Sequence, residues 1–202
     1  MTASAAPLRS VRGSAPARAV VRASLIGVAL AVVTIGRWRA TLDGADPLAV
    51  GLLFGLLLFS VALVAGLRPS IPSTSTVAIG LAGGAVLVVV AVVVSAGSPG
   101  GLFAPAAPFG PWAAITILVA IGEEAILRGA LFDAIDEAGG LITAIVVTSV
   151  AFALIHVPLY GWHVVPLDLG VGVWFAGLRL VSGRVAAPAI AHAIADLATW
   201  WL

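Results

Sequence analysis

Long apolar runs, separated by short polar turns, make up most of the chain. Seven runs can be drawn, over residues 23–36, 47–67, 77–96, 112–135, 141–157, 167–181 and 186–202. Most approach the roughly 20 apolar residues that an α-helix needs to cross a bilayer. The intervening stretches, such as RPSIPSTST and GSPGGLFAPAAPFGP, are rich in Gly, Pro and Ser, which interrupt helices. The pattern predicts an all-α, polytopic transmembrane helical bundle of about seven membrane segments.

The composition supports a membrane protein and removes several kinds of chemistry. Hydrophobic residues make up 61% of the 202 residues and charged residues only 9%, whereas soluble domains carry about 25% charged residues. The chain contains no cysteine, which excludes disulfides, thiolate metal sites and a cysteine nucleophile.

The first 22 residues carry four arginines and no acid. The apolar run that follows ends at TIGRWRA, without the small-residue cleavage site of a signal peptide. We therefore expect residues 1–22 to form a disordered basic cytoplasmic tail before an uncleaved helix. Such an arginine cluster is typical of a topology signal and favours anionic membrane lipids, so we expect no nucleic-acid partner.

The remaining arginines complete the predicted topology. A cytoplasmic N-terminus puts Arg68 and Arg184 inside, and leaves Arg37 and Arg39 outside. All ten basic residues are arginine, a bias typical of GC-rich bacterial genomes. We therefore expect an integral protein of a bacterial plasma membrane.

Charged and imidazole side chains inside apolar segments are concentrated in the C-terminal half. Each intramembrane charge costs about 2.5 to 3.5 kcal/mol on insertion scales, so such residues mark a functional site. We predict N-terminal scaffold helices over residues 23–110 and a catalytic membrane core over residues 111–202. The polar residues that need explanation are Glu123, Glu124, Arg128, His156, His192 and Asp196.

Helical spacing separates the two glutamates. Glu124 and Arg128 are four residues apart, so they can form an ion pair along one face of a helix. Glu123 lies about 100° round the helix from Glu124, so the two carboxylates cannot both pair with Arg128 equally well. On this reasoning Glu123 is a general base for water and Glu124 orients Arg128, although the two assignments can be exchanged.

Two further segments carry similar polar faces. His156 lies four residues after Phe152, and Asp196 lies four residues after His192. An Asp one turn from a His can accept its hydrogen bond and fix the tautomer of the ring. If the three faces meet, Glu123 can activate water while a histidine stabilises the oxyanion, which is the chemistry of amide hydrolysis.

Other interpretations of the same residues stay open. A Glu–Arg pair can simply lock helix packing, as in a non-catalytic scaffold or an immunity-type protein. A His–Asp pair can relay protons in a small proton-coupled transporter. We interpret Asp168 as a segment start, and Gly172 and Gly177 as positions of close helix packing.

Three motifs resemble those of a known family. EEAILR at 123–128, FALIH at 152–156 and HAIAD at 192–196 match the EExxxR, FxxxH and HxxxN/D motifs of the CPBP intramembrane proteases. This family includes the type II CAAX prenyl endopeptidases and bacteriocin-processing enzymes. The resemblance covers roughly residues 111–202, with the motifs in order on separate apolar segments.

The resemblance implies an intramembrane endopeptidase that cleaves a membrane-associated protein or peptide. Glu123 would activate water, Glu124 and Arg128 would shape the site, and His156 would be catalytic. His192 and the residue at 196 would support the oxyanion or position the substrate. Many members have Asn at that place, and an ionised Asp196 cannot donate a hydrogen bond, so here it would orient His192 or be protonated.

The sequence leaves two questions open. The family is usually named as metalloproteases, and Glu123, His156 and His192 are suitable zinc ligands, yet glutamate-activated water without metal explains the same residues. Counting residues by depth also places Glu123 near mid-membrane and His156 near the end of its segment. The polar faces then meet only if helices are offset, tilted or interrupted, or if PLYGWHVVP dips into the membrane.

Overall fold

The computed structural model describes residues 14–96 and 108–201, and within them every regular element is a helix. The predicted all-α, polytopic helical bundle is therefore confirmed. The elements in chain order are α1 (Ser14–Leu42), α2 (Pro47–Val64), α3 (Thr74–Ala96), α4 (Phe109–Glu124), the π-helix η1 (Ala125–Leu131), α5 (Phe132–Gly139), α6 (Leu141–Tyr160), the 3₁₀ turn η2 (Trp162–Val164), α7 (Val165–Ser182) and α8 (Ala186–Ala198).

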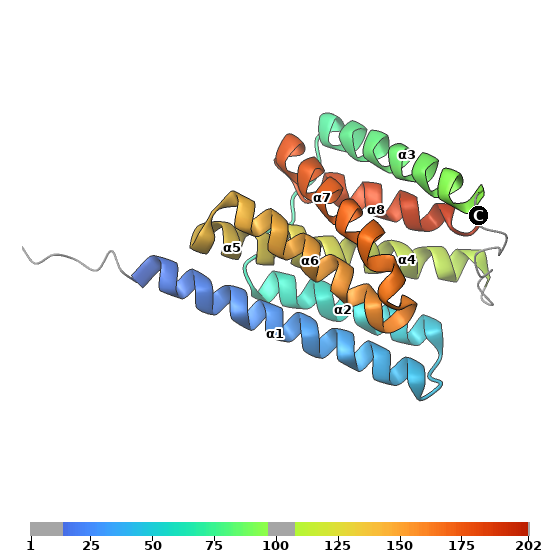
Figure 1. The fold of residues 1–202 in the computed structure, drawn as a ribbon, viewed down its shortest axis with the longest axis horizontal. Helices are drawn as coiled ribbons and strands as arrows, with labels where there is room; N and C mark the ends of the chain where they lie inside the picture. Colours follow the sequence, from blue (N-terminus) through green and yellow to red (C-terminus); the bar gives the residue numbers. More distant parts are fainter. Residues whose placement is uncertain (1–13, 97–107, 202) are drawn as a thin grey trace, which may run out of the picture.

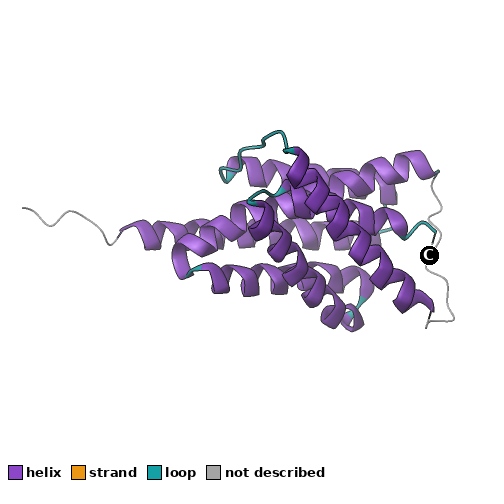
Figure 2. Ribbon diagram, turned by 90° about the horizontal axis from the view of Figure 1, so that it is seen from above, coloured by secondary structure: helices purple, strands orange, loops and turns teal. Residues whose placement is uncertain are grey.

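The helices form two layers. Across Figure 1 the first layer runs in the order α3, α8, α4, α2 and α1, and each helix contacts its neighbour in that order. α6 and α7 pack together across this layer, with α7 against α8 and α3, and α6 against α1 and α5. Figure 2 shows the helical bundle from above, with helices in purple. The arrangement places the C-terminal end of α4 and all of η1 inside the bundle.

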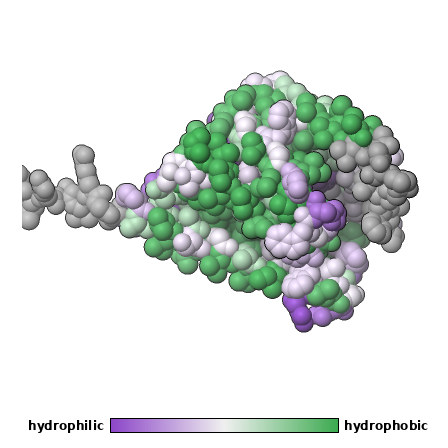
Figure 3. Space-filling view, in the orientation of Figure 1, coloured by the Kyte–Doolittle hydropathy of each residue, from purple (hydrophilic) through white to green (hydrophobic). Residues whose placement is uncertain are grey.

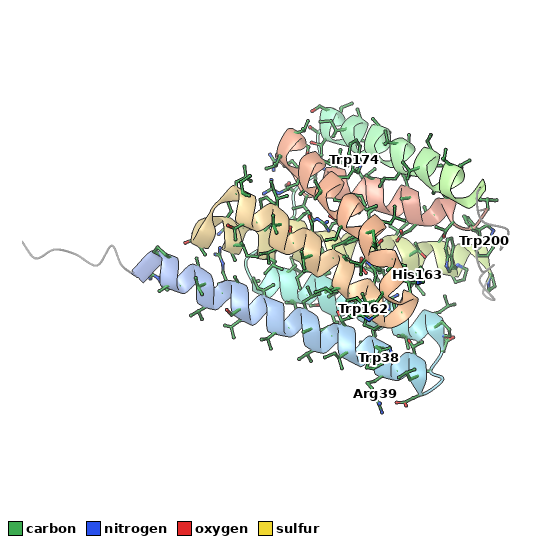
Figure 4. The ribbon with its side chains drawn as sticks, viewed as in Figure 1. Trp38, Arg39, Trp162, His163, Trp174 and Trp200 are labelled. Atoms are coloured by element: carbon green, nitrogen blue, oxygen red, sulfur yellow. The ribbon has the colours of Figure 1, made fainter. Side chains whose placement is uncertain are left out.

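The outer surface fits a lipid environment. Five helices among the described residues are long and apolar enough to cross a membrane, and α8 is a shorter apolar helix. Apolar side chains cover most of the face shown in Figure 3. Trp38, Trp162 and Trp200 lie toward the same end of the bundle (Figure 4), as tryptophans at a membrane–water interface do. The protein is an integral membrane protein.

The predicted tail boundary at residue 22 is wrong, because α1 begins at Ser14. Ala19 is buried with only 2% of its surface exposed. The Arg22 guanidinium pairs with the Glu137 carboxylate at 2.9 Å. These contacts hold the first turns of α1 against the bundle, and residues 1–13 lie outside the described residues.

The boundary predicted at Pro158 is also wrong. α6 continues through Pro158 to Tyr160 and ends at Gly161, whose φ of 88° favours glycine. The stretch PLYGWHVVP is therefore the end of α6, a 3₁₀ turn and the start of α7. The extra turn of α6 carries His156 further from the helix end than the sequence suggests.

Glycines allow the closest helix contacts. A Cβ on Gly122 of α4 would lie 2.8 Å from the carbonyl oxygen of Gly55 on α2. A Cβ on Gly172 of α7 would lie 2.9 Å from Cα of Ser149 on α6, which confirms the prediction of close packing there. The same prediction for Gly177 is wrong, because a Cβ at that position would meet nothing within 4 Å.

Candidate functional site

The two glutamates end α4, and the chain continues directly into the π-helix η1. The sequence predicts a single helix here but gives no sign of the π turn, a feature frequent at functional sites. Residues 122–132 are all buried. Arg179 of α7 braces this segment, since its Nε donates to the carbonyl oxygen of Arg128 at 3.1 Å and its Nη2 pairs with Asp133 at 3.2 Å.

Arg128 is completely buried, with 0% exposure. Its Nη1 donates to Glu124 Oε1 at 3.0 Å and its Nη2 donates to the Gly172 carbonyl oxygen at 2.9 Å. The guanidinium carbon lies 4.7 Å from the ring centroid of Phe152 and 5.3 Å from that of Phe175. The Glu124–Arg128 pair predicted from the spacing is therefore formed, and two aromatic rings cover it.

Glu123 is surrounded by cationic or imidazole groups without a direct hydrogen bond to them. Its Oε2 lies 3.8 Å from Nε2 of His156 and 3.8 Å from Nε2 of His192. Its Oε1 lies 3.8 Å from Nη1 of Arg37. The side chain is 2% exposed, and Oε2 has no hydrogen-bond partner among the described residues. The three polar faces therefore meet at this carboxylate.

His156 is held from both its own helix and α7. Nδ1 lies 2.9 Å from the carbonyl oxygen of Phe152, which can only accept, so Nδ1 carries the proton of this hydrogen bond. Asp168 Oδ2 also lies 3.4 Å from Nδ1. In the neutral ring, Nε2 is then the acceptor and faces Glu123. Asp168 lies in the first turn of α7, three residues after the helix begins, and the sequence does not predict its contact with His156.

His192 is 4% exposed and lies between two carboxylates. Its Nδ1 is 3.1 Å from Glu124 Oε1, and its Nε2 is 3.4 Å from Asp196 Oδ2, one helical turn away. The ring stacks on Phe175 with centroids 4.9 Å apart. The predicted His192–Asp196 neighbourhood is present, and the bond to Glu124 links it to Arg128 as well.

Arg37 is the site residue that the sequence reasoning placed elsewhere. α1 extends to Leu42, so Arg37 lies more than a turn inside the helix rather than in a loop. Its guanidinium lies 4.4 Å above the Phe54 ring of α2 and faces Glu123. Arg39, by contrast, points away from the bundle in Figure 4. Only the tertiary packing of α1 distinguishes the two arginines.

The donor atoms do not form a metal site as they are placed. Two ligands about 2.1 Å from a tetrahedral zinc lie about 3.4 Å apart, shorter than the 3.8 Å from Glu123 Oε2 to each histidine Nε2. Among the described residues, no group of three or more His, Asp or Glu side chains is arranged to hold a metal ion. The other ring nitrogens are already hydrogen-bonded, Nδ1 of His156 to the Phe152 carbonyl oxygen and Nδ1 of His192 to Glu124.

A family model matches most of the C-terminal half of the chain. Residues 105–198 match the model described as "Type II CAAX prenyl endopeptidase Rce1-like". Over these residues, just under half of the chain, the sequence is similar to the Rce1-like family. No curated protein and no solved structure gave a significant match.

The family similarity indicates the activity at a coarse level. The Rce1-like family is a protease family, and the similarity supports a CAAX-type intramembrane protease at family level, with a peptide or protein substrate and a membrane setting. The matched range contains both glutamates, Arg128 and both histidines of the site. Arg37 lies outside it.

Proposed function

We propose that this Rce1-like protein is an intramembrane endopeptidase in which Glu123 activates a water molecule to hydrolyse a peptide bond. The substrate is a membrane-associated protein or peptide. The observation that carries the proposal is the buried Oε2 of Glu123, which lies between two histidine nitrogens and has no hydrogen-bond partner among the described residues. A buried carboxylate oxygen needs a hydrogen-bond donor, and a water molecule can supply one.

The water is oriented by two acceptors. Because Nδ1 of His156 donates to Phe152, Nε2 of the neutral ring can accept a hydrogen bond from the same water that donates to Glu123. With both hydrogens engaged, the water presents a lone pair to the scissile carbonyl carbon. Glu123 takes one proton as the new C–O bond forms, and returns it to the leaving nitrogen as the C–N bond breaks.

His192 is placed to stabilise the oxyanion. When both of its nitrogens carry protons, Nδ1 donates to Glu124 and Nε2 can turn from Asp196 to the developing oxyanion. Before this turn, Asp196 holds the ring through Nε2 rather than donating to substrate, as expected for a carboxylate at this place. Glu124 is the positioning partner of both Arg128 and His192.

Arg37 completes the surroundings of the base. Its guanidinium faces Oε1 of Glu123, whereas both histidines face Oε2. The cation holds one oxygen and leaves the other toward water. We propose that residues 111–202 form the catalytic core, and that residues 23–110 serve as a scaffold which also supplies Arg37 from α1.

A metal ion is not part of the proposed steps, because the donor set does not fit one as placed. The name metalloprotease is therefore not carried over to this chain. We propose that the protein resides in a bacterial plasma membrane, with its N-terminus in the cytoplasm. We expect it to contact membrane lipids and to bind no nucleic acid.

Comparison of membrane proteomes tests the function. Cells producing the wild-type chain and cells producing Glu123→Gln are compared by mass spectrometry for new peptide termini. We expect termini that occur only with the wild type. A non-catalytic scaffold would give identical sets of termini, and a proton-coupled transporter would instead give pH-dependent flux in liposomes without a peptide product.

A further inference from the structure

A further carboxylate reaches the site from outside the three sequence motifs. Asp168 lies in the first turn of α7, within a segment long and apolar enough to cross a membrane. Its side chain is 18% exposed, and its Oδ2 lies 3.4 Å from Nδ1 of His156. A carboxylate in such a segment is costly and marks a functional position. The proposed steps of hydrolysis leave this carboxylate without a role.

The place of Asp168 in α7 also has a structural explanation. An acid in the first turn of a helix interacts favourably with the positive end of the helix dipole. Within the described residues, however, the start of α7 has no side-chain capping hydrogen bond. The carboxylate instead meets an imidazole of α6, the helix that packs against α7 (Figure 1). The dipole accounts for an acid in this turn but not for its contact with His156.

Two oxygens lie at Nδ1 of His156, and they differ in charge. The Phe152 carbonyl oxygen, at 2.9 Å, accepts the Nδ1 proton and so fixes the tautomer of the neutral ring. That oxygen carries no net charge, whereas an ionised Asp168 does. A negative charge beside the ring favours its cationic form, so Asp168 stabilises His156 most when Nε2 also takes a proton.

Hydrolysis of an amide by water requires two proton transfers. In the proposed steps, one proton of the water passes to Glu123 and then to the leaving nitrogen. The other proton stays on the oxygen that has joined the carbonyl carbon, and it must leave to give carboxylate and ammonium products. Nε2 of His156 faces Glu123 Oε2 at 3.8 Å and is an acceptor in the neutral ring. His192 is already a donor in these steps, so His156 is the imidazole that can take the second proton.

We propose that Asp168 is a positioning residue of the reaction, which stabilises His156 when Nε2 takes the second proton of the water. The water oxygen forms the new C–O bond, the C–N bond breaks, and Glu123 gives the first proton to the leaving nitrogen. His156 holds the second proton as an imidazolium beside Asp168 and passes it to the amine, which becomes an ammonium. The other product leaves as a carboxylate, and Glu123 and His156 return to their starting states. This inference rests on the proposed endopeptidase function.

Removing the charge of Asp168 without changing its size tests the inference. We expect Asp168→Asn to lower kcat about 10- to 100-fold, a part of what acid–base catalysis contributes, with KM near the wild-type value. Asp136→Asn, at an exposed position of α5, is the control and should leave both constants unchanged. A role in the helix dipole alone would lower the thermal midpoint in detergent and leave kcat unchanged, which would overturn the inference.

A double-mutant cycle tests whether Asp168 acts through His156. Residues that act as a unit lose much less on the second substitution than on the first. In a protein that already carries His156→Ala, Asp168→Asn should therefore lower the remaining kcat little further. Effects that multiply would show that Asp168 acts independently of His156, and the inference would be wrong.

A small soluble carboxylate separates the charge of Asp168 from its packing. Asp168→Ala opens space beside Nδ1 at a position that is partly exposed. Added formate should restore most of the lost kcat to Asp168→Ala, and should leave the wild type and Asp136→Ala unchanged. A folded Asp168→Ala protein that formate does not rescue would contradict the inference, and the cycle with Asp168→Asn decides the question if the alanine variant does not fold. Retained cleavage in Glu123→Gln would instead contradict the endopeptidase mechanism itself.

Discussion

Arg128 Nη1 donates a hydrogen bond to Glu124 Oε1 at 3.0 Å, and both side chains are completely buried. Breaking a buried pair leaves one charge uncompensated, which costs about 3–5 kcal/mol. Arg128→Met should therefore lower the free energy of unfolding by about that amount, measured by denaturant unfolding in detergent. Arg184→Met is the control and should change stability little, since the Arg184 side chain donates an exposed hydrogen bond to Ser70.

The same pair gives a second, more specific outcome. Replacing both charges with apolar groups of similar size removes the uncompensated charge. The double variant Glu124→Met with Arg128→Met should therefore recover part of the stability lost by Arg128→Met alone, while remaining inactive because His192 has lost its partner. A double variant less stable than the sum of the single changes would contradict the ion-pair account.

Helix packing at Gly172 should be intolerant of a methyl group. A Cβ there would press on Ser149 at 2.9 Å, and the Gly172 carbonyl oxygen accepts from Arg128. Overpacking of this kind costs about 1–3 kcal/mol, so Gly172→Ala should lower the thermal midpoint and the activity. Gly177→Ala is the matched substitution on the same helix, and should leave stability equal or slightly raised. Equal effects at both positions would contradict the packing argument.

Arg37 should affect catalysis in a way that Arg39 does not. Arg37→Gln removes the cation facing Glu123 Oε1, and we expect kcat to fall about tenfold, which corresponds to about 1.4 kcal/mol, with partial recovery in Arg37→Lys. Arg39→Gln, two residues along the same helix and directed away from the bundle, should leave kcat unchanged. If Arg37→Gln retains the wild-type kcat, Arg37 does not contribute to catalysis.

The site geometry predicts a metal-independent reaction. Glu123 and the two histidines are not arranged to hold a metal ion. Prolonged treatment with EDTA or 1,10-phenanthroline, followed by assay in metal-depleted buffer, should therefore leave cleavage within twofold of the untreated protein. Loss of cleavage that added zinc restores would show that the side chains rearrange around a metal.

Much of the site could be predicted because helical spacing is local information. The i, i+4 relation places Arg128 beside Glu124 and Asp196 beside His192, whatever the rest of the chain does. The cost of polar groups in apolar helices also identifies which faces turn inward. These two rules together predict the all-α bundle and the polar residues that meet at Glu123.

The contacts that were missed depend on how helices pack against one another. Asp168 reaches His156 from α7, and Phe175 of α7 stacks on His192 of α8. No spacing within one segment contains such a relation. The sequence predicts Arg37 in an outer loop because the C-terminal end of α1 is polar, although that helix continues to Leu42.

Local backbone geometry was the other source of error. The π-helix Ala125–Leu131 follows the glutamates without any Pro or charge pattern that would indicate it. The start of α1 at Ser14 depends on contacts such as Arg22 with Glu137, which are distant in sequence. Both differences change where side chains point while leaving the number and order of predicted segments nearly intact.

The cleavage rate of Glu123→Gln tests the central claim most directly. The amide keeps the size of the side chain but cannot accept a proton from water, and a general base contributes about 10²- to 10⁴-fold. With a substrate identified from wild-type membranes, we expect the variant's kcat to fall by that factor while its thermal midpoint stays near that of the wild type. A folded Glu123→Gln protein that cleaves within tenfold of the wild-type rate would contradict the assignment of Glu123 as the base.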